Sequence, residues 1–330
     1  MDDRATERTE VLAPDAGGIA AAAGILARGG LVAFPTETVY GLGADAGNGR
    51  AVAAIYEAKS RPRFNPLIAH VESVLAARRV GRLEGAAAKL ADRFWPGPLT
   101  LVVPACEPCP VSDLARAGLP TVAIRVPAHP VAQALIAAAG RPLVAPSANR
   151  SGHVSATTAE HVLADLSGRI DAVIDAGPTP LGLESTILAC LGGEVRMLRA
   201  GGLPREAIEA ALGFALAGAE GSAEAAPLSP GRLASHYAPR ARLRLGATEI
   251  FPGEGLLGFG TEPVPGQELA AARENLSASG DLAEASANLF AALRRLDATG
   301  VATIAVAPIP THGLGEAIAD RLARAAHPER

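Results

Sequence analysis

The sequence from Leu31 to Gly43 reads LVAFPTETVYGLG, an apolar run followed by a polar cluster and two glycines. The run from Leu31 to Phe34 predicts a short buried strand. A helix is expected from Ala51 to Lys59, with Pro62 just beyond its end. A strand, a polar loop and a helix in this order are typical of α/β folds, in which ligands bind outside the strand ends.

Strands and helices continue to alternate along the chain. The first dozen residues are expected to form a frayed tail, followed by a helix that Asp15 caps and that ends at Gly29-Gly30. Further strands are expected at 67–71, 99–103, 121–126, 142–145, 172–174, 185–189 and 195–198. Further helices are expected at 85–94, 131–139, 158–166 and 204–213.

The length of 330 residues and a shift in composition predict two domains. A larger domain is expected at 13–213 and a smaller α/β domain at 241–330. Residues 214–240 are rich in Ala, Gly, Ser and Pro, which is typical of a linker. This linker carries Ser229-Pro230-Gly231 and His236-Tyr237-Ala238-Pro239, which are too specific for a plain spacer.

The overall composition excludes several classes of protein. Hydrophobic residues make up 49% and charged residues 19%, which excludes a disordered chain. The net charge of −4 disfavours a protein built mainly to bind nucleic acid. Only 3 cysteines are present, the N-terminus has no apolar signal segment, and no run reaches the ~20 apolar residues of a membrane span. A cytoplasmic protein with no membrane partner is therefore expected.

Two polar clusters follow the first predicted strand and the first predicted helix after it. Thr36, Glu37 and Thr38 are either a polar turn or part of a ligand site, with the glycines beyond them allowing a ligand to approach the backbone closely. Lys59-Ser60-Arg61-Pro62-Arg63 either complements the dipole at a helix end or binds a polyphosphate. Pro62 favours the second interpretation, because it forces Arg61 out of the helix.

Other candidates are single residues or short motifs. Ser147 and Asn149 follow a short apolar strand and would face one side of an extended chain. Arg125 is a cation inside an apolar strand, which indicates either a structural ion pair or an anionic ligand. His70 ends a predicted strand and is either a surface residue or a ligand group. The Cys106 to Cys109 pair lacks further metal ligands and is interpreted as an ordinary loop. No P-loop, GxGxxG, GxSxG or HExxH motif is present.

Several unusual motifs together resemble the YrdC-type family in its long, two-domain form. They are FPTETVYGLGADA (34–46), KSRPRFNPLIAHV (59–71), FWPGPLTLVV (94–103), VAIRVPAHP (122–130), APSANRSGHVSAT (145–157), ESTI (184–187), SPGRLASHYAP (229–239) and GLGEAIADRLARAA (313–326). The resemblance implies an open, twisted α/β domain with a concave cavity, followed by a small Rossmann-like α/β domain.

The resemblance also implies a nucleotidyltransferase reaction. L-threonine, bicarbonate and ATP would give L-threonylcarbamoyladenylate and pyrophosphate. A separate threonylcarbamoyl transferase complex would then pass the group to adenosine 37 of tRNA, so tRNA would be an indirect partner. Such a transfer needs positioning and charge neutralisation more than a covalent nucleophile, which agrees with a chain rich in cations and hydroxyls at its strand ends.

Particular residues receive roles by the same resemblance. Residues that would hold L-threonine are Thr36, His70, Arg125, Ala145 (through its backbone) and Ser185. Residues that would bind ATP are Lys59, Arg61, Arg63, Thr121, Ser147, Asn149, Ser155, Arg199, His236 and Tyr237. Arg125 would pair with the threonine carboxylate, and Lys59 and Arg61 would neutralise phosphates. Mg²⁺ would enter with ATP, because no dedicated protein cage for it is visible.

The chain departs from the family pattern at Ala200, where a proline is usual, and at Gly231 to Ser235, before HYAP. Neither departure removes a proposed ligand group. Three alternative functions stay open at this point: an RNA-binding module without turnover, a related carbamoyl-adenylating domain, and an ATP-binding regulatory protein.

Overall fold

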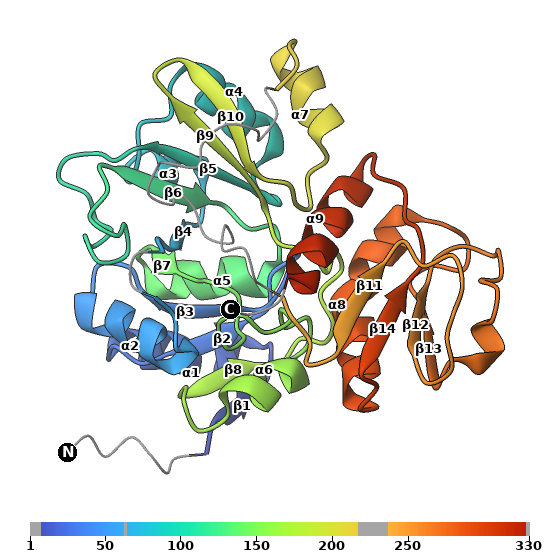
Figure 1. Ribbon diagram of the computed structural model, residues 1–330. Helices are drawn as coiled ribbons and strands as arrows, with labels where there is room; N and C mark the ends of the chain where they lie inside the picture. The colour runs from blue at the N-terminus through green and yellow to red at the C-terminus, as the bar shows by residue number, and fades with distance from the viewer. Residues whose placement is uncertain (1–7, 63–64, 217–236, 328–330) are drawn as a thin grey trace.

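The computed structural model describes residues 8–62, 65–216 and 237–327, which form two β-sheets with covering helices (Figure 1). The strands of the larger sheet are β1 (Glu10–Leu12), β2 (Val32–Phe34), β3 (Gly41–Asp45), β4 (Ile68–His70), β5 (Leu99–Pro104), β6 (Thr121–Arg125), β7 (Leu143–Val144), β8 (Ala172–Ile174), β9 (Thr186–Leu191) and β10 (Glu194–Arg199). They lie in the order β1-β8-β2-β3-β7-β4-β6-β5-β9-β10 and mix parallel with antiparallel pairs. The mixed α/β architecture predicted for this part is confirmed.

The helices of the larger unit follow the predicted ones closely, except that α2 begins two residues earlier than expected and the short helix α3 was not predicted. They are α1 (Ala16–Ala27), α2 (Gly49–Lys59), α3 (Val74–Ala77), α4 (Gly85–Phe94), α5 (Pro130–Ala139), α6 (Ala159–Leu166) and α7 (Arg205–Leu212). Asp15 caps α1 by accepting a hydrogen bond from the Gly18 N–H at 2.9 Å. Thr158 caps α6, and Gly213 ends α7 in the left-handed conformation.

Two strands of the larger sheet are absent from the predicted pattern. β1 forms where a frayed tail is expected, because it pairs in parallel with β8. Gly41 and Gly43 lie in β3, antiparallel to β2, instead of in a turn open to a ligand. A Cβ atom at Gly43 would lie 2.8 Å from the Phe34 ring, so glycine at this position makes room for that ring.

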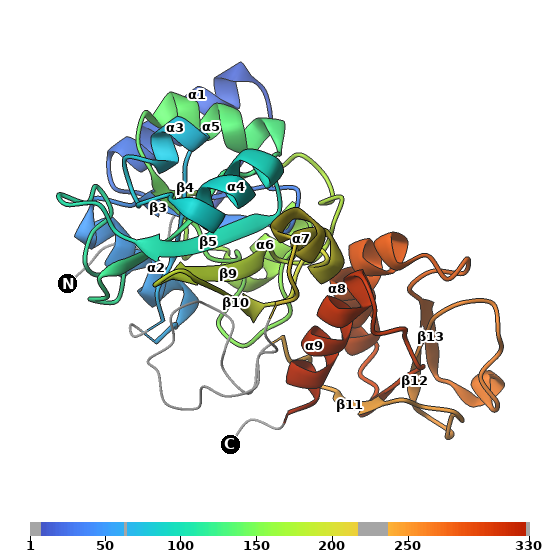
Figure 2. The same ribbon diagram turned by 90° about the horizontal axis from the view of Figure 1, so that it is seen from above.

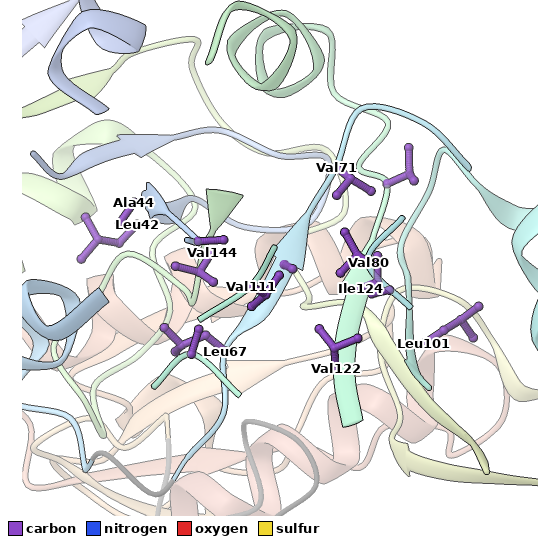
Figure 3. Packing of buried hydrophobic residues seen from close by; sticks show 14 of the residues in the cluster. Leu42, Ala44, Leu67, Val71, Val80, Leu101, Val111, Val122, Ile124 and Val144 are labelled. Atoms are coloured by element: carbon purple, nitrogen blue, oxygen red, sulfur yellow. The ribbon is translucent and has the colours of Figure 1, made fainter. Parts of the chain in front are cut away.

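The alternation of side chains in β4 and β6 separates the core from the site. Figure 3 shows apolar side chains of β3, β5, β6 and β7 gathered on one side of the sheet with those that flank β4. Ile124 points to this core, whereas its neighbours Ala123 and Arg125 point to the other face. Ile68 and His70 of β4 pair with Ala123 and Arg125 of β6, so these four residues share that second face.

The second sheet is smaller and entirely parallel. Its strands are β11 (Arg242–Leu245), β12 (Gly255–Gly258), β13 (Ala272–Asn275) and β14 (Thr303–Val306), in the order β11-β14-β12-β13. A 3₁₀ turn, η1 (Gln267–Leu269), precedes β13. The long helices α8 (Leu282–Ala298) and α9 (Leu314–Ala326) complete the unit. A small α/β unit at the C-terminal end is confirmed, whereas the exact boundaries at 213 and 241 stay a prediction.

Helices α8 and α9 lie between the second sheet and the larger unit (Figures 1 and 2). Ser286 of α8 donates a hydrogen bond to the Leu181 carbonyl at 2.9 Å, and Arg205 pairs with Glu316 of α9 at 2.5 Å. Gly182 has a φ of +67°, and a Cβ atom there would lie 2.4 Å from the Ser286 carbonyl oxygen. Only glycine therefore allows the loop before β9 to approach α8 this closely.

No helix in the described ranges combines the length and the apolar character that crossing a bilayer requires.

Candidate active site

A small pocket, with a cavity volume of about 40 Å³, opens at the carboxyl ends of β4 and β6. It is lined by Thr38, Val39, Arg61, Ile68, His70, Arg125, Ala145, Pro146, Ser147, Glu184, Ser185, Arg199 and Tyr237. Larger hollows lie beside α5, with about 440 Å³, and between α6 and α8, with about 580 Å³. Neither larger hollow holds any of the predicted site residues, so the chemistry points to the smaller pocket.

Arg125 at the end of β6 is both ion-paired and part of the pocket wall. Its Nη2 atom lies 2.6 Å from Glu37 Oε1, its Nη1 donates to Thr38 Oγ1 at 2.9 Å, and its Nε donates to the Gly97 carbonyl at 3.3 Å. Burial alone would raise the pKa of Glu37, but the Arg125 charge, together with hydrogen bonds from Arg125 and the backbone, outweighs burial and the pKa is lowered. The two interpretations of this buried cation, ion pair and anion site, are therefore compatible.

His70 of β4 stands beside Arg125 and is buried, so it is not the surface residue that one interpretation of the sequence allowed. Its Nδ1 lies 3.1 Å from the Ile68 carbonyl oxygen. A carbonyl only accepts hydrogen bonds, so Nδ1 carries the proton and Nε2 is an acceptor. Burial, and then the Arg125 charge, lower the pKa of His70 from 6.5 to about 3. The ring is therefore neutral at any working pH.

Lys59 lies behind the pocket wall, not on it. Its side chain is fully buried at the end of α2, and Nζ donates to the Ser147 carbonyl at 2.6 Å and to the Asn149 carbonyl. Burial and then the nearby Arg61 charge lower the pKa of Lys59 well below its ordinary value. Ser60 turns the chain with a φ of +53° between Lys59, at the end of α2, and Arg61.

Arg61 is a cation on the pocket wall with unused hydrogen-bonding capacity. Its side chain is buried, and its Nε and Nη2 atoms have no hydrogen-bond partner within the described residues. Burial lowers its pKa from 12.5 only to about 10, so the guanidinium stays charged. Buried donors of this kind are rare unless a ligand completes them.

Arg199 supplies a third arginine to the pocket wall. Its Nη2 donates to the Ser185 carbonyl at 2.8 Å and to Ser185 Oγ at 3.2 Å. Ser185 Oγ also lies 2.7 Å from Thr100 Oγ1, so one serine links β5, the start of β9 and the end of β10. The pocket thus holds three arginines on three different strands or loops, which suits a ligand with several negative charges.

Tyr237 closes the pocket from the side of the second unit. Its ring is buried, stacks on Phe290 of α8 with centroids 5.6 Å apart, and lies 5.2 Å from the guanidinium carbon of Arg321 in α9. Burial raises the pKa of its phenol, so Tyr237 is uncharged.

The predicted site residues fall into four groups. The residues on the pocket wall are Arg61, His70, Arg125, Ala145, Ser147, Ser185, Arg199 and Tyr237. The residues buried behind it are Thr36, Lys59, Asn149 and Ser155. Thr121 stands at the start of β6, on the face of Arg125 but at the other end of the strand. Arg63 and His236 lie outside the described residues.

Three charged residues of the site received no role from the family resemblance, although Glu37 was a candidate in the polar cluster after the first predicted strand. Glu37 and Glu184 stand within the quoted FPTETVYGLGADA and ESTI motifs, and each is paired with a buried arginine. Arg321, in the motif GLGEAIADRLARAA, is the partner of Glu184. The motifs give the only sequence signal for these residues, because nothing local indicates that their charges are buried.

No group of three or more metal-binding side chains of His, Cys, Asp or Glu occurs within 8–62, 65–216 and 237–327.

Comparisons with known proteins cover both units. The Sua5–YciO–YrdC family model, described as telomere recombination, matches residues 24–201, and a model described as the C-terminal domain of threonylcarbamoyl-AMP synthase matches residues 203–327. The threonylcarbamoyl-AMP synthase of Bacillus subtilis (strain 168) is 43% identical over 321 residues, covering 93% of this chain and 92% of that protein. The protein of the same name from Pyrococcus abyssi (strain GE5 / Orsay) is 41% identical and covers 92% of each chain.

A solved structure is also similar over nearly the whole length. The crystal structure of P. abyssi Sua5 complexed with L-threonine matches with a TM-score of 0.87 and 38% identity, covering 96% of this chain and 98% of that chain.

Proposed function

The chain belongs to the Sua5 family of threonylcarbamoyl-AMP synthases, and on this basis we propose that its three-arginine pocket joins L-threonine, bicarbonate and ATP. The reaction is the synthesis of L-threonylcarbamoyladenylate, a nucleotidyl transfer. The motif resemblance found in the sequence is confirmed by these comparisons. The roles of bicarbonate and ATP, and of individual residues, are the proposal.

The observation that carries the proposal is the arrangement of Arg61. This guanidinium lines the pocket with two buried nitrogens that have no hydrogen-bond partner in the described part of the chain. Arg199 faces the same pocket with a second positive charge. Two arginines on one pocket wall suit the phosphates of ATP, since phosphate oxygens accept hydrogen bonds from guanidinium groups in pairs.

L-threonine is proposed to lie at the carboxyl ends of β4 and β6. The carboxylate would meet Arg125, which lines the pocket and also pairs with Glu37. Ser185 and the Ala145 backbone line the same pocket, whereas Thr36 acts from behind it, with its hydroxyl donating to the Val39 carbonyl at 2.7 Å.

The chemistry requires no covalent intermediate on the protein. The threonine amine takes up CO₂ from bicarbonate to form a carbamate, while the bicarbonate hydroxide and the amine proton leave as water, and a carbamate oxygen attacks the α-phosphorus of ATP. The bond between the α-phosphorus and the bridging oxygen then breaks, and pyrophosphate leaves with the electron pair. The arginines neutralise the charge that develops on the phosphates, which is the main form of catalysis in such transfers.

Mg²⁺ is proposed to arrive with ATP. Asn149 Oδ1 is buried and accepts no hydrogen bond within the described residues. An oxygen acceptor repels phosphate oxygens but suits Mg²⁺ or a water molecule that Mg²⁺ holds. Asn149, with Ser147 beside it on the pocket wall, therefore fits the metal that accompanies the triphosphate, and Lys59 fixes the backbone of both residues.

Pyrophosphate release tests the proposed function directly. Purified protein with ATP and Mg²⁺ should release pyrophosphate only when both L-threonine and bicarbonate are present. Release that ignores either omission, or salt-sensitive binding of RNA without any turnover, would contradict the proposal and favour the RNA-binding alternative.

Threonine affinity should be independent of pH between about 5.5 and 7.5. The pKa of His70 falls from 6.5 to about 3 in the folded chain, so the ring stays neutral throughout this range and takes up no proton when threonine binds. Calorimetry with L-threonine alone, in the wild-type protein and in His70→Asn, measures this. A wild-type affinity that weakens roughly tenfold as the pH falls through 6.5, and does not weaken in the variant, would show a titrating His70.

The product would serve a downstream transferase complex that modifies tRNA, as the family resemblance implies. This partner, and the predicted cytoplasmic location, stay predictions.

A further inference from the structure

Arg321 belongs to the second unit, yet its side chain reaches the wall of the pocket. It is the largest fully buried side chain of the described residues, with 0% of its side chain exposed. From α9 its Nε donates to Glu184 Oε2 at 2.8 Å, and its Nη2 donates to the Ala200 carbonyl at 2.9 Å. Its guanidinium carbon also lies 5.2 Å from the centroid of the Tyr237 ring.

The carboxylate of Glu184 requires a buried cation beside it in the pocket wall. It lines the pocket, and its other carboxylate oxygen accepts a hydrogen bond from Ser155 at 2.6 Å. Burial alone would raise the pKa of Glu184, but the Arg321 and Arg199 charges lower it to about 2, so the group is ionised. An ionised carboxylate in a pocket that takes a triphosphate opposes binding unless a fixed cation neutralises it.

Arg199 would be the alternative partner of this carboxylate. It is the second arginine whose charge acts on Glu184, and it is held near the pocket by the Ser185 carbonyl. If Arg321 were absent, the Glu184 carboxylate would attract Arg199 and withdraw it from the nucleotide. Arg321 therefore neutralises Glu184, and it leaves the charge of Arg199 available to bind the nucleotide.

We propose that Arg321 is a positioning residue through which the second unit completes the nucleotide half of the pocket. It acts by neutralising and orienting Glu184. It also contacts the Tyr237 ring, which stacks on Phe290 of α8. The proposal rests on the proposed function, because it assumes that the nucleotide lies against Arg199 and Tyr237. It gives the C-terminal unit a defined task in binding ATP and none in binding L-threonine.

The test compares Arg321→Met with variants that separate charge from structure. Arg321→Met should raise the KM for ATP roughly 10- to 100-fold and change the KM for L-threonine by less than about threefold. Arg321→Lys, which keeps the charge but not the planar fork, should give an intermediate value. The double variant Glu184→Gln/Arg321→Met should recover most of the ATP affinity, since its neutral amide has no charge with which to oppose phosphate or attract Arg199.

Arg205→Met is the matched control. It removes the other ion pair between α9 and the larger unit, with Glu316 at 2.5 Å, without touching the pocket. It should leave both KM values unchanged. Equal effects of Arg205→Met and Arg321→Met, or a double variant that binds ATP no better than Arg321→Met, would overturn the proposal. If Arg321→Met does not fold, Arg321→Lys and the double variant decide the question by the same comparison.

Binding of ATP with Mg²⁺, measured by calorimetry, separates this proposal from the proposed function. Nucleotide affinity that falls in Arg321→Met and returns in the double variant supports the role of Arg321 whether or not turnover is seen. If the wild-type protein releases no pyrophosphate in response to threonine, this result contradicts the proposed function but not the role of Arg321 in binding ATP.

Discussion

Arg61→Ala should lower kcat for pyrophosphate release roughly 100- to 1000-fold while the protein remains folded. The guanidinium lines the pocket, and its Nε and Nη2 atoms have no hydrogen-bond partner in the described residues, so no interaction within this part of the fold is lost with them. The missing charge would be felt most in the transition state, where negative charge on the phosphates is redistributed. Steady-state kinetics at saturating ATP, together with a thermal unfolding curve, measure both halves of the prediction.

Arg141→Ala provides the control for the loss of an arginine. Arg141 is exposed, pairs with Asp45 at 2.9 Å and lies outside the pocket, so this variant should keep the wild-type kcat. Normal pyrophosphate release from Arg61→Ala would remove Arg61 from the phosphate site. A large loss of unfolding temperature would instead assign it a structural role.

Arg125→Ala should raise the KM for L-threonine by roughly 100-fold or more and leave the KM for ATP within about threefold of its wild-type value. Two effects add. The partner of the threonine carboxylate is lost, and Glu37, now without the cation at 2.6 Å, becomes an unpaired negative charge in the threonine half of the pocket. Initial rates over separate ranges of threonine and ATP concentration give the two constants.

A double variant separates these two effects. Glu37→Gln/Arg125→Ala should regain stability that Arg125→Ala loses, because no buried charge is left unpaired, but it should still bind threonine poorly. A larger change in the ATP constant than in the threonine constant would contradict the assignment of Arg125 to the carboxylate.

Local signals in the sequence predicted most of the helices and the strands between them. Asp15 and Thr158 cap helices through hydrogen bonds to residues three positions later, and such signals act within a few residues. β1 and β3 were missed because their formation depends on partners elsewhere in the chain. β3 contains two glycines, which are typical of a turn, but one of them, Gly43, leaves room in the strand for the Phe34 ring.

The candidate site shows the same division between local and distant causes. His70 and Arg125 could be expected near each other once their strands were paired, because strand alternation fixes which face each one takes. The position of Lys59 behind the Ser147 to Asn149 loop could not be predicted from the sequence, since its two carbonyl partners are set by tertiary packing. Arg321 lies 137 positions from Glu184, and no spacing rule spans such a separation.

The hydrogen bond between His70 and the Ile68 carbonyl has a consequence for which molecules the β4–β6 end of the pocket accepts. It leaves the remaining ring nitrogen of His70 as a lone-pair acceptor, next to the donor groups of Arg125. The two neighbouring strands therefore present opposite polarities to a small molecule. A zwitterion can satisfy both at once, whereas a dicarboxylate would suit Arg125 and leave the imidazole facing a second acceptor. This end of the pocket thus selects ligands by the direction of their dipole as well as by their size.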